Sequence, residues 1–189
     1  MFDKKSFEQI RKELHNFEIK REEIIQRSRE IITLSKQIIY AVHREDLVNG
    51  EALLKKIKVA VKSLDVDRDY EQGISTVAFQ EYVEAACYYE FIKNAKIPTV
   101  KELAVRTEDY LLGLCDLSGE LVRKAVAYAI KNDVKRVLQI KELVDEMYGE
   151  FLKFDLRNGE LRKKSDAIKW NLNKLEDIVF SLKTGRSIA

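Results

Sequence analysis

Tyr110-Leu-Leu-Gly-Leu-Cys-Asp-Leu-Ser-Gly-Glu-Leu121 is the stretch around which this chain is organised. From Tyr110 to Leu117 its only charged residue is Asp116, and an aspartate in so apolar a run is unfavourable to bury unless a positive group meets it. Glu120 follows one helical turn later, so both carboxylates project from one face of a helix. The stretch therefore predicts an apolar helix with a paired acidic edge.

The composition is that of a single helix-rich domain over residues 1–189. The chain has one proline, seven glycines and 35% charged residues of both signs, and it contains no linker-like segment. Its net charge of +2 does not by itself indicate nucleic-acid binding. We expect no membrane association, because no apolar run reaches the roughly 18 residues of a membrane span. The two cysteines form no Cys-x-x-Cys pattern, which favours a cytoplasmic protein with reduced thiols.

Apolar residues recur every three to four positions through most of the chain. This period predicts an all-α fold, a bundle of six to seven mostly antiparallel helices. The first helix is expected over residues 5–44, and the third follows Asp65 to Asp69 and runs to about Ala95. The expected helix breaks and starts are Asn49–Gly50, Pro98–Thr99, Thr107, Asn132–Asp133, Asn158–Gly159 and Thr184–Gly185. The helix that starts at Pro98–Thr99 is expected to end near Arg106. Several helices carry apolar residues on more than one face, so we expect self-association.

A second acidic pair lies in another apolar stretch. Glu81 and Glu84 are three residues apart, so they share one helix face. If the two acidic helices pack side by side, four carboxylates surround one pocket, which is the ligand set that Mg²⁺ or Mn²⁺ prefers. Acidic pairs at such spacings also occur on solvated helix surfaces. The apolar neighbours of Asp116 favour the site, as do Gly113 and Gly119, whose lack of a side chain would let another group approach.

The carboxylates can be given roles in phosphodiester hydrolysis. Glu81, Glu84 and Asp116 would ligate the metal, and Glu120 would ligate a metal or orient the attacking water. Other metal chemistries have less support. Neither of the two histidines is preceded by glutamate at the spacing of a di-iron helix bundle, and no phosphate-binding glycine motif is present.

The same residues carry a resemblance to the translin family, and within it to the translin-associated factor X (TRAX) branch. The most specific segments are Gln80-Glu-Tyr-Val-Glu-Ala85 and Asp109 to Leu121, and Ser28 to Arg44 and Leu161 to Arg186 support them. The resemblance implies a fold of about seven helices that assembles into hollow octamers binding single-stranded RNA or DNA. In the TRAX branch it also implies Mg²⁺-dependent endoribonuclease activity, which falls by position on Glu81, Glu84, Asp116 and Glu120.

The two branches of the family differ in ways that bear on this chain. Translin itself lacks the first acidic pair and is the nucleic-acid-binding partner in the assembly. The present chain keeps both acidic motifs, whereas its last helix resembles translin at least as much as TRAX. This mixture suggests one compact chain that performs both roles as a homo-oligomer.

Cations near the carboxylates are candidates to hold RNA phosphates. Arg123, three residues beyond Glu120, is the first candidate. A line at helical spacing on the first helix is the second, with Tyr40 available for base stacking. That line comprises Arg29, Lys36, Tyr40 and His43. Lys20, Arg21, Arg27 and Arg44 are weaker candidates.

Two alternatives to an endoribonuclease stay open. A translin-type assembly could bind single-stranded RNA or DNA without cleaving it, although pure binding does not require Glu81 and Glu84. An all-α nucleoside triphosphate pyrophosphohydrolase also uses two acidic pairs on neighbouring helices. Its second pair is usually three residues apart, whereas Asp116 and Glu120 are four apart.

Overall fold

The computed structural model describes residues 2–64 and 73–185, and within these ranges the chain is helical with no strand. The helices are α1 (Lys4–His43), α2 (Leu47–Ser63), α3 (Gly73–Asn94), α4 (Val100–Leu103), α5 (Thr107–Ile130), α6 (Val134–Phe151) and α7 (Glu160–Thr184). The predicted all-α fold of six to seven helices is therefore confirmed. The residues expected to precede the third helix, Asp65 to Asp69, lie outside the described ranges. No described helix is long and apolar enough to cross a membrane.

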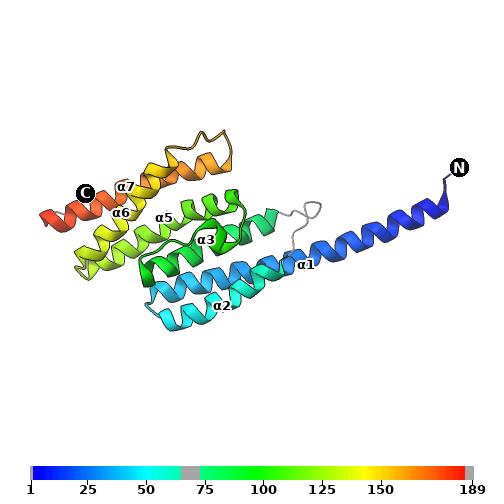
Figure 1. Cartoon of the computed structure of the whole chain (residues 1–189), viewed down its shortest axis with the longest axis horizontal. Helices are drawn as coiled ribbons and strands as arrows, with labels where there is room; N and C mark the ends of the chain where they lie inside the picture. The colour runs from blue at the N-terminus through cyan, green and yellow to red at the C-terminus, as the bar shows by residue number, and fades with distance from the viewer. Residues whose placement is uncertain (1, 65–72, 186–189) are drawn as a thin grey trace.

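The helices stack in layers, with α3 and α5 in the middle (Figure 1). Helix α3 packs against α1, α2 and α5, and α5 packs against α3, α6 and α7. Successive long helices reverse direction, while the connection through α4 lets α5 run the same way as α3. The core is built from fully buried residues at helical spacing, such as Ile31 and Ile38 of α1 and Leu117 and Leu121 of α5. The acidic stretch of the sequence therefore lies on a central helix.

The turn between α1 and α2 lies earlier than expected. Arg44 ends α1, and Glu45 adopts a left-handed conformation with φ of 64°. Asp46 then caps α2, its carboxylate accepting a hydrogen bond from the backbone N–H of Asn49 at 3.1 Å. The predicted break at Asn49–Gly50 is therefore wrong. Gly50 lies inside α2, where a Cβ would come within 3.0 Å of the Tyr89 ring, so this glycine permits close packing rather than a turn.

Most other helix ends follow their sequence signals. Thr99 starts α4 with a reciprocal capping box to Glu102, as Pro98–Thr99 predicts. The helix ends at Leu103, not near Arg106, because Ala104 turns into a left-handed conformation with φ of 55°. Gly185 ends α7 in the same conformation, which confirms the predicted C-terminal glycine.

Candidate functional site

Gly113 brings the two acidic helices together. A Cβ at this position would lie 2.6 Å from Cβ of Val83 and 2.7 Å from the backbone oxygen of Gln80, so only glycine lets α5 approach α3 this closely. The expected role of Gly113 is confirmed. Gly119 is exposed and a Cβ there would meet Asn171 only at 3.9 Å, so no other helix approaches it closely and the approach of a metal or ligand there stays a prediction. The close approach is made on one side of Asp116 only.

A cleft of about 320 Å³ opens where α1, α3 and α5 meet. Three of the four predicted carboxylates line it. The lining residues are Lys36, Ile39, Tyr40, Glu81, Glu84, Glu120 and Arg123. Asp116 lies close enough to act electrostatically on both Glu81 and Glu84. The structure thus brings Glu81, Glu84 and Glu120 to one cleft, with Asp116 near it.

Glu84 is the most strongly perturbed of these acids. Burial raises its pKa to about 8, and the carboxylates of Asp116, Glu81 and Glu120 contribute in the same direction. The pKa of Glu81 is also raised, again mainly by burial. Neither carboxylate forms a hydrogen bond or an ion pair within the described part of the chain. A cation added to the cleft would therefore relieve an unfavourable concentration of negative charge.

The pKa of Glu120 is shifted in the opposite direction, downward. Nε2 of His43, at the end of α1, donates a hydrogen bond to its carboxylate, and the Tyr88 hydroxyl donates to Nδ1 of the same ring at 3.2 Å. The hydrogen bond from His43 lowers the pKa of Glu120. Nη1 of Arg123 lies 3.6 Å from the same carboxylate, and its side chain is 64% exposed. Glu120 is thus kept ionised and oriented, while the guanidinium faces solvent.

Asp116 has a partner that the sequence analysis missed. Nζ of Lys164, on α7, lies 2.6 Å from Oδ2 of Asp116 and 3.3 Å from Oε1 of Gln80. The side chains of Lys164 and Asp116 are 30% and 35% exposed, so water and ions can reach the pair. The apolar surroundings of Asp116 indicated that a cation should meet it, but no spacing rule relates α5 to a residue of α7.

The oxygen ligands at this site suit a hard divalent cation, but the side chains would have to move to bind one. Four carboxylates are present, and oxygen ligands are those that Mg²⁺ and Mn²⁺ prefer. Within the described residues, however, no three acidic, histidine or cysteine side chains converge closely enough to hold an ion. Asp116 accepts a hydrogen bond from Lys164, and Glu120 accepts one from His43. A metal would therefore have to separate Asp116 from Lys164.

The predicted RNA-contacting residues divide into two groups. Arg123, Lys36 and Tyr40 line the cleft directly. His43 does not line the cleft but is hydrogen-bonded to Glu120, which does. Arg44 donates a hydrogen bond to the hydroxyl of Tyr40 at 3.1 Å. Arg29 is exposed on α1 and is not among the described residues that line the cleft. The roles of these residues stay predictions.

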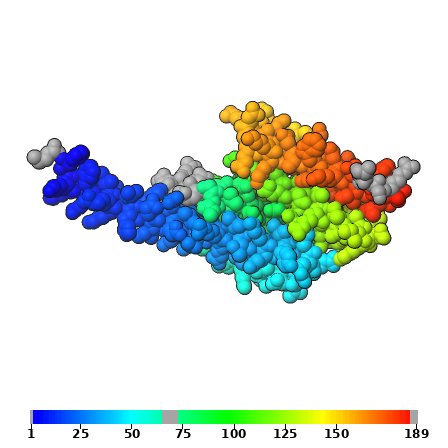
Figure 2. Space-filling model, turned by 180° about the vertical axis from the view of Figure 1, so that it is seen from behind, coloured from blue at the N-terminus to red at the C-terminus, as the bar shows by residue number. Residues whose placement is uncertain are grey.

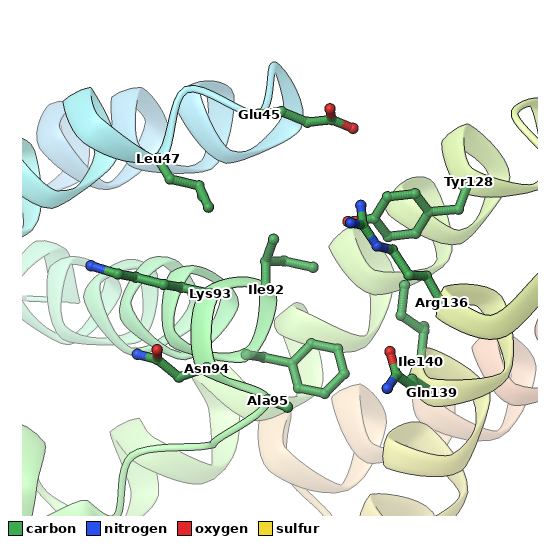
Figure 3. Close-up of a pocket in the computed structure, with 11 residues that line it drawn as sticks. Glu45, Leu47, Ile92, Lys93, Asn94, Ala95, Tyr128, Arg136, Gln139 and Ile140 are labelled. Atoms are coloured by element: carbon green, nitrogen blue, oxygen red, sulfur yellow. The ribbon is translucent and has the colours of Figure 1, made fainter. Parts of the chain in front are cut away.

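A larger cavity, of about 430 Å³, lies away from these acids (Figure 3). It opens at the end of the bundle, where Glu45, Tyr128 and Arg136 surround an apolar floor that includes Ile140. The Arg136 guanidinium stacks on the Tyr128 ring at 5.0 Å, and Lys131 neutralises Glu45 at 2.8 Å. Its lining contains one carboxylate, which is already paired, so the smaller acidic cleft is the better candidate for metal chemistry.

Three comparisons place the chain among known proteins. The Translin family model matches residues 19–184. An uncharacterised protein of Methanocaldococcus jannaschii is 33% identical, over 88% of this chain and 78% of its own. Translin-associated protein X of Rattus norvegicus is 25% identical, over 94% of this chain and 77% of its own. The solved structure of the AfC3PO–duplex RNA complex shares 26% identity and a TM-score of 0.87, covering 96% of this chain and 98% of that one.

Proposed function

We propose that this chain is a Mg²⁺- or Mn²⁺-dependent endoribonuclease that cleaves single-stranded RNA within a homo-oligomer. The chain belongs to the translin family. One observation carries the proposal: Glu81, Glu84 and Glu120 line one cleft together with Arg123, and Asp116 acts on two of them. The similarity to translin-associated protein X and to a protein solved in complex with duplex RNA supports RNA as the ligand.

Glu81, Glu84 and Asp116 are the residues that would hold the metal. Among the described residues Glu84 has no counter-charge in contact, and its pKa is raised, so cation binding and loss of its proton would be coupled. When bound, the divalent ion would promote ionisation of a water molecule and stabilise negative charge on the phosphate. Lys164 would leave Asp116 and become available to a neighbouring phosphate oxygen.

The remaining site residues orient the reactants. Glu120, ionised and hydrogen-bonded by His43, would accept a proton from the attacking water. Arg123 is exposed beside it and would bind the scissile phosphate through its guanidinium. The four carboxylates would repel an RNA strand without these cations, so phosphate binding and metal binding are expected to reinforce each other.

The exposed face of α1 gives the strand a path into the cleft. Tyr40 is 58% exposed, and its ring, held by Arg44, can stack on a base. Lys36 lies one turn before Tyr40 and also lines the cleft, where it can neutralise a phosphate. Arg29 lies on the same helix beyond the cleft and would contact RNA only outside the reacting bond. We expect single-stranded DNA to bind to the same face.

Labelled RNA distinguishes this proposal from its alternatives. The purified chain is incubated with single-stranded RNA, duplex RNA or single-stranded DNA, with Mn²⁺, with Mg²⁺ or with EDTA. Internal cleavage of single-stranded RNA should require the metal and should disappear in Glu81→Gln and Asp116→Asn. Glu146→Gln, the same change on the exposed surface of α6, should cleave like the wild type. Cleavage that survives in EDTA and in both site variants would contradict the proposal.

A non-catalytic nucleic-acid-binding assembly is the second candidate. The pairing of Asp116 with Lys164 and of Glu120 with His43 favours it, because these two acids have partners without any metal. In that case labelled RNA would be shifted in a native gel but not shortened when Mn²⁺ is added. Release of pyrophosphate from a nucleoside triphosphate would instead identify a pyrophosphohydrolase.

The assembly is proposed to be a homo-octamer. Large apolar side chains are exposed on several helices, including Ile130 at the end of α5 and Trp170 and Phe180 on α7. Such side chains are favoured at contacts between subunits. Light scattering on the purified chain measures the subunit number directly.

A further inference from the structure

The first half of α1 stands clear of the bundle (Figure 1, Figure 2). Every residue from Lys4 to Glu23 is exposed except Phe17, which is partly buried. Burial of α1 in the bundle begins at Ile24. A helical segment of this length is only marginally stable alone in water, because most helix stability in proteins comes from packing. The segment therefore requires a partner to be well formed.

The apolar residues of this segment form one row. Phe7, Ile10, Leu14 and Phe17 follow a 3-4-3 spacing, and the same spacing continues through Arg21 to the buried Ile24. This is the spacing of a coiled-coil seam. Phe7, Ile10 and Leu14 are 44%, 51% and 59% exposed, so these three residues of the row are largely uncovered, whereas the bundle covers the row from Ile24 onward.

The charges of the segment show which partner would fit. Residues 4–12 carry four basic side chains and one acidic, whereas residues 13–23 carry four acidic and two basic. An identical segment lying antiparallel would place the basic half of each helix beside the acidic half of the other. A parallel arrangement would place like charges together. The near balance of charge over the whole segment does not favour an RNA backbone as its partner.

We propose that residues 4–23 of α1 pair with the same residues of a second copy as an antiparallel coiled coil. In the register that sets Phe7 against the second copy's Phe17, Ile10 lies against Leu14 in both directions. The same register brings Asp3, the N-cap just before α1, near the second copy's Arg21, so opposite charges lie at both ends of the pairing. This contact would link two bundles independently of the proposed cleavage activity.

The bundles leave room for this pairing. The twofold axis of the register passes near residue 12, and Ile24 is about 12 residues further, or about 18 Å along the helix at 1.5 Å per residue. The two bundles would therefore lie about 36 Å apart along the coiled coil, and neither would cover the seam. Each acidic cleft lies on a bundle, so the pairing leaves both clefts open.

Disulfide trapping tests the pairing and its direction. Full-length Ile10→Cys and Leu14→Cys chains are coexpressed and oxidised, and the linked peptides are identified by mass spectrometry. The native Cys87 and Cys115 are buried and can remain. The expected product joins position 10 of one chain to position 14 of the other. Links of 10 to 10 and 14 to 14 without the mixed product would indicate parallel pairing and overturn the proposal, as would the absence of any link.

Solution mass gives a second measurement. Leu14→Glu places a charge in the seam and should lower the mass of the assembly at least twofold, with unchanged thermal unfolding of the bundle. Asn16→Glu adds the same charge on the opposite, exposed side of α1 and should leave the mass unchanged. A wild-type mass equal to that of one chain, or equal masses for the two variants, would overturn the proposal.

Discussion

Glu84 and Lys124 are ionisable side chains on the neighbouring helices α3 and α5, and their surroundings differ. Lys124 is 1% exposed, and its Nζ donates to the backbone oxygens of Val42 at 3.0 Å and His43 at 3.4 Å, with Glu45 at 3.8 Å. Burial still lowers the pKa of Lys124, but its hydrogen bonds are made within the fold. Glu84 has three acids near it and no ion pair in the described chain.

The difference separates a structural charge from a functional candidate. Lys124 satisfies carbonyl groups at the C-terminal end of α1, which have no partner in the helix itself. It therefore stabilises the junction between α1 and α5. Glu84 destabilises the metal-free protein, because its ionised form is disfavoured where the fold places it. This position is consistent with a carboxylate that binds a cation from solution.

The largest expected effect is that of Glu84→Gln on cleavage. Removing this carboxylate should lower metal-dependent RNA cleavage by at least about a hundredfold, a loss of the size seen when a metal site is disrupted. The initial rate of RNA cleavage at saturating Mn²⁺ measures it. Glu146→Gln serves as the matched control. A Glu84→Gln rate close to that of the wild type would show that Glu84 resembles Lys124 in being structural only.

Glu84→Gln should also stabilise the metal-free protein at alkaline pH. The folded pKa of about 8 lies above the ordinary value of 4.5, so the folded state retains a proton that the unfolded state has lost. Stability therefore falls as pH rises from about 4.5 to about 8. The gain in the variant should be on the order of a few kcal/mol at pH 8.5 and negligible at pH 4. Denaturant unfolding at both pH values measures it, and equal differences would contradict the assignment.

Lys124→Met should destabilise the fold by about 1–3 kcal/mol, because the hydrogen bonds from the buried Nζ to the carbonyl groups of Val42 and His43 are lost. Lys131→Met is the matched control, since Lys131 also binds Glu45 but is 60% exposed. That change should alter stability by less than about 1 kcal/mol. Urea unfolding at pH 7 compares the two variants. Equal losses in the free energy of unfolding would show that the buried Lys124 contributes no more to stability than the exposed Lys131.

Gly113→Ala should destabilise by about 1–3 kcal/mol, since its Cβ would press α5 away from α3. Gly119→Ala lies on the same helix with open space around it and should stabilise by about 0.5–1 kcal/mol. Thermal unfolding of both variants measures these opposite effects. A stabilised Gly113→Ala protein would show that the close approach of the acidic helices is not required.

A further expected effect is the pH dependence of Mn²⁺ binding. Binding must remove the proton from Glu84, so apparent affinity should rise with pH, by up to about tenfold per unit below pH 8, and then level off. Calorimetry in buffers of different ionisation enthalpy measures the proton released. In Glu84→Gln no proton should be released from this position, and affinity independent of pH in the wild type would exclude the coupling.

Most of the secondary structure was predictable, because it depends on residues close together in the sequence. The 3-4 spacing of apolar residues predicted the helices, and Thr99 and Gly185 predicted an end of α4 and of α7 correctly. Asn49–Gly50 misled because glycine also occurs where two helices touch, and Tyr89, which Gly50 contacts, is far along the chain. Glu45 adopts the left-handed turn although glycine is the residue usually expected there.

The sequence by itself determined that four acids lie on two apolar helix faces, because helical spacing and polarity are local properties. Only the tertiary structure decided which charges meet. It placed Lys164 of α7 against Asp116 and His43 of α1 against Glu120, whereas Glu84 has no counter-charge in contact among the described residues. These pairings depend on how closely the helices approach, which Gly113 controls between α3 and α5. Contacts between distant helices follow from packing, which no periodic pattern within one helix encodes.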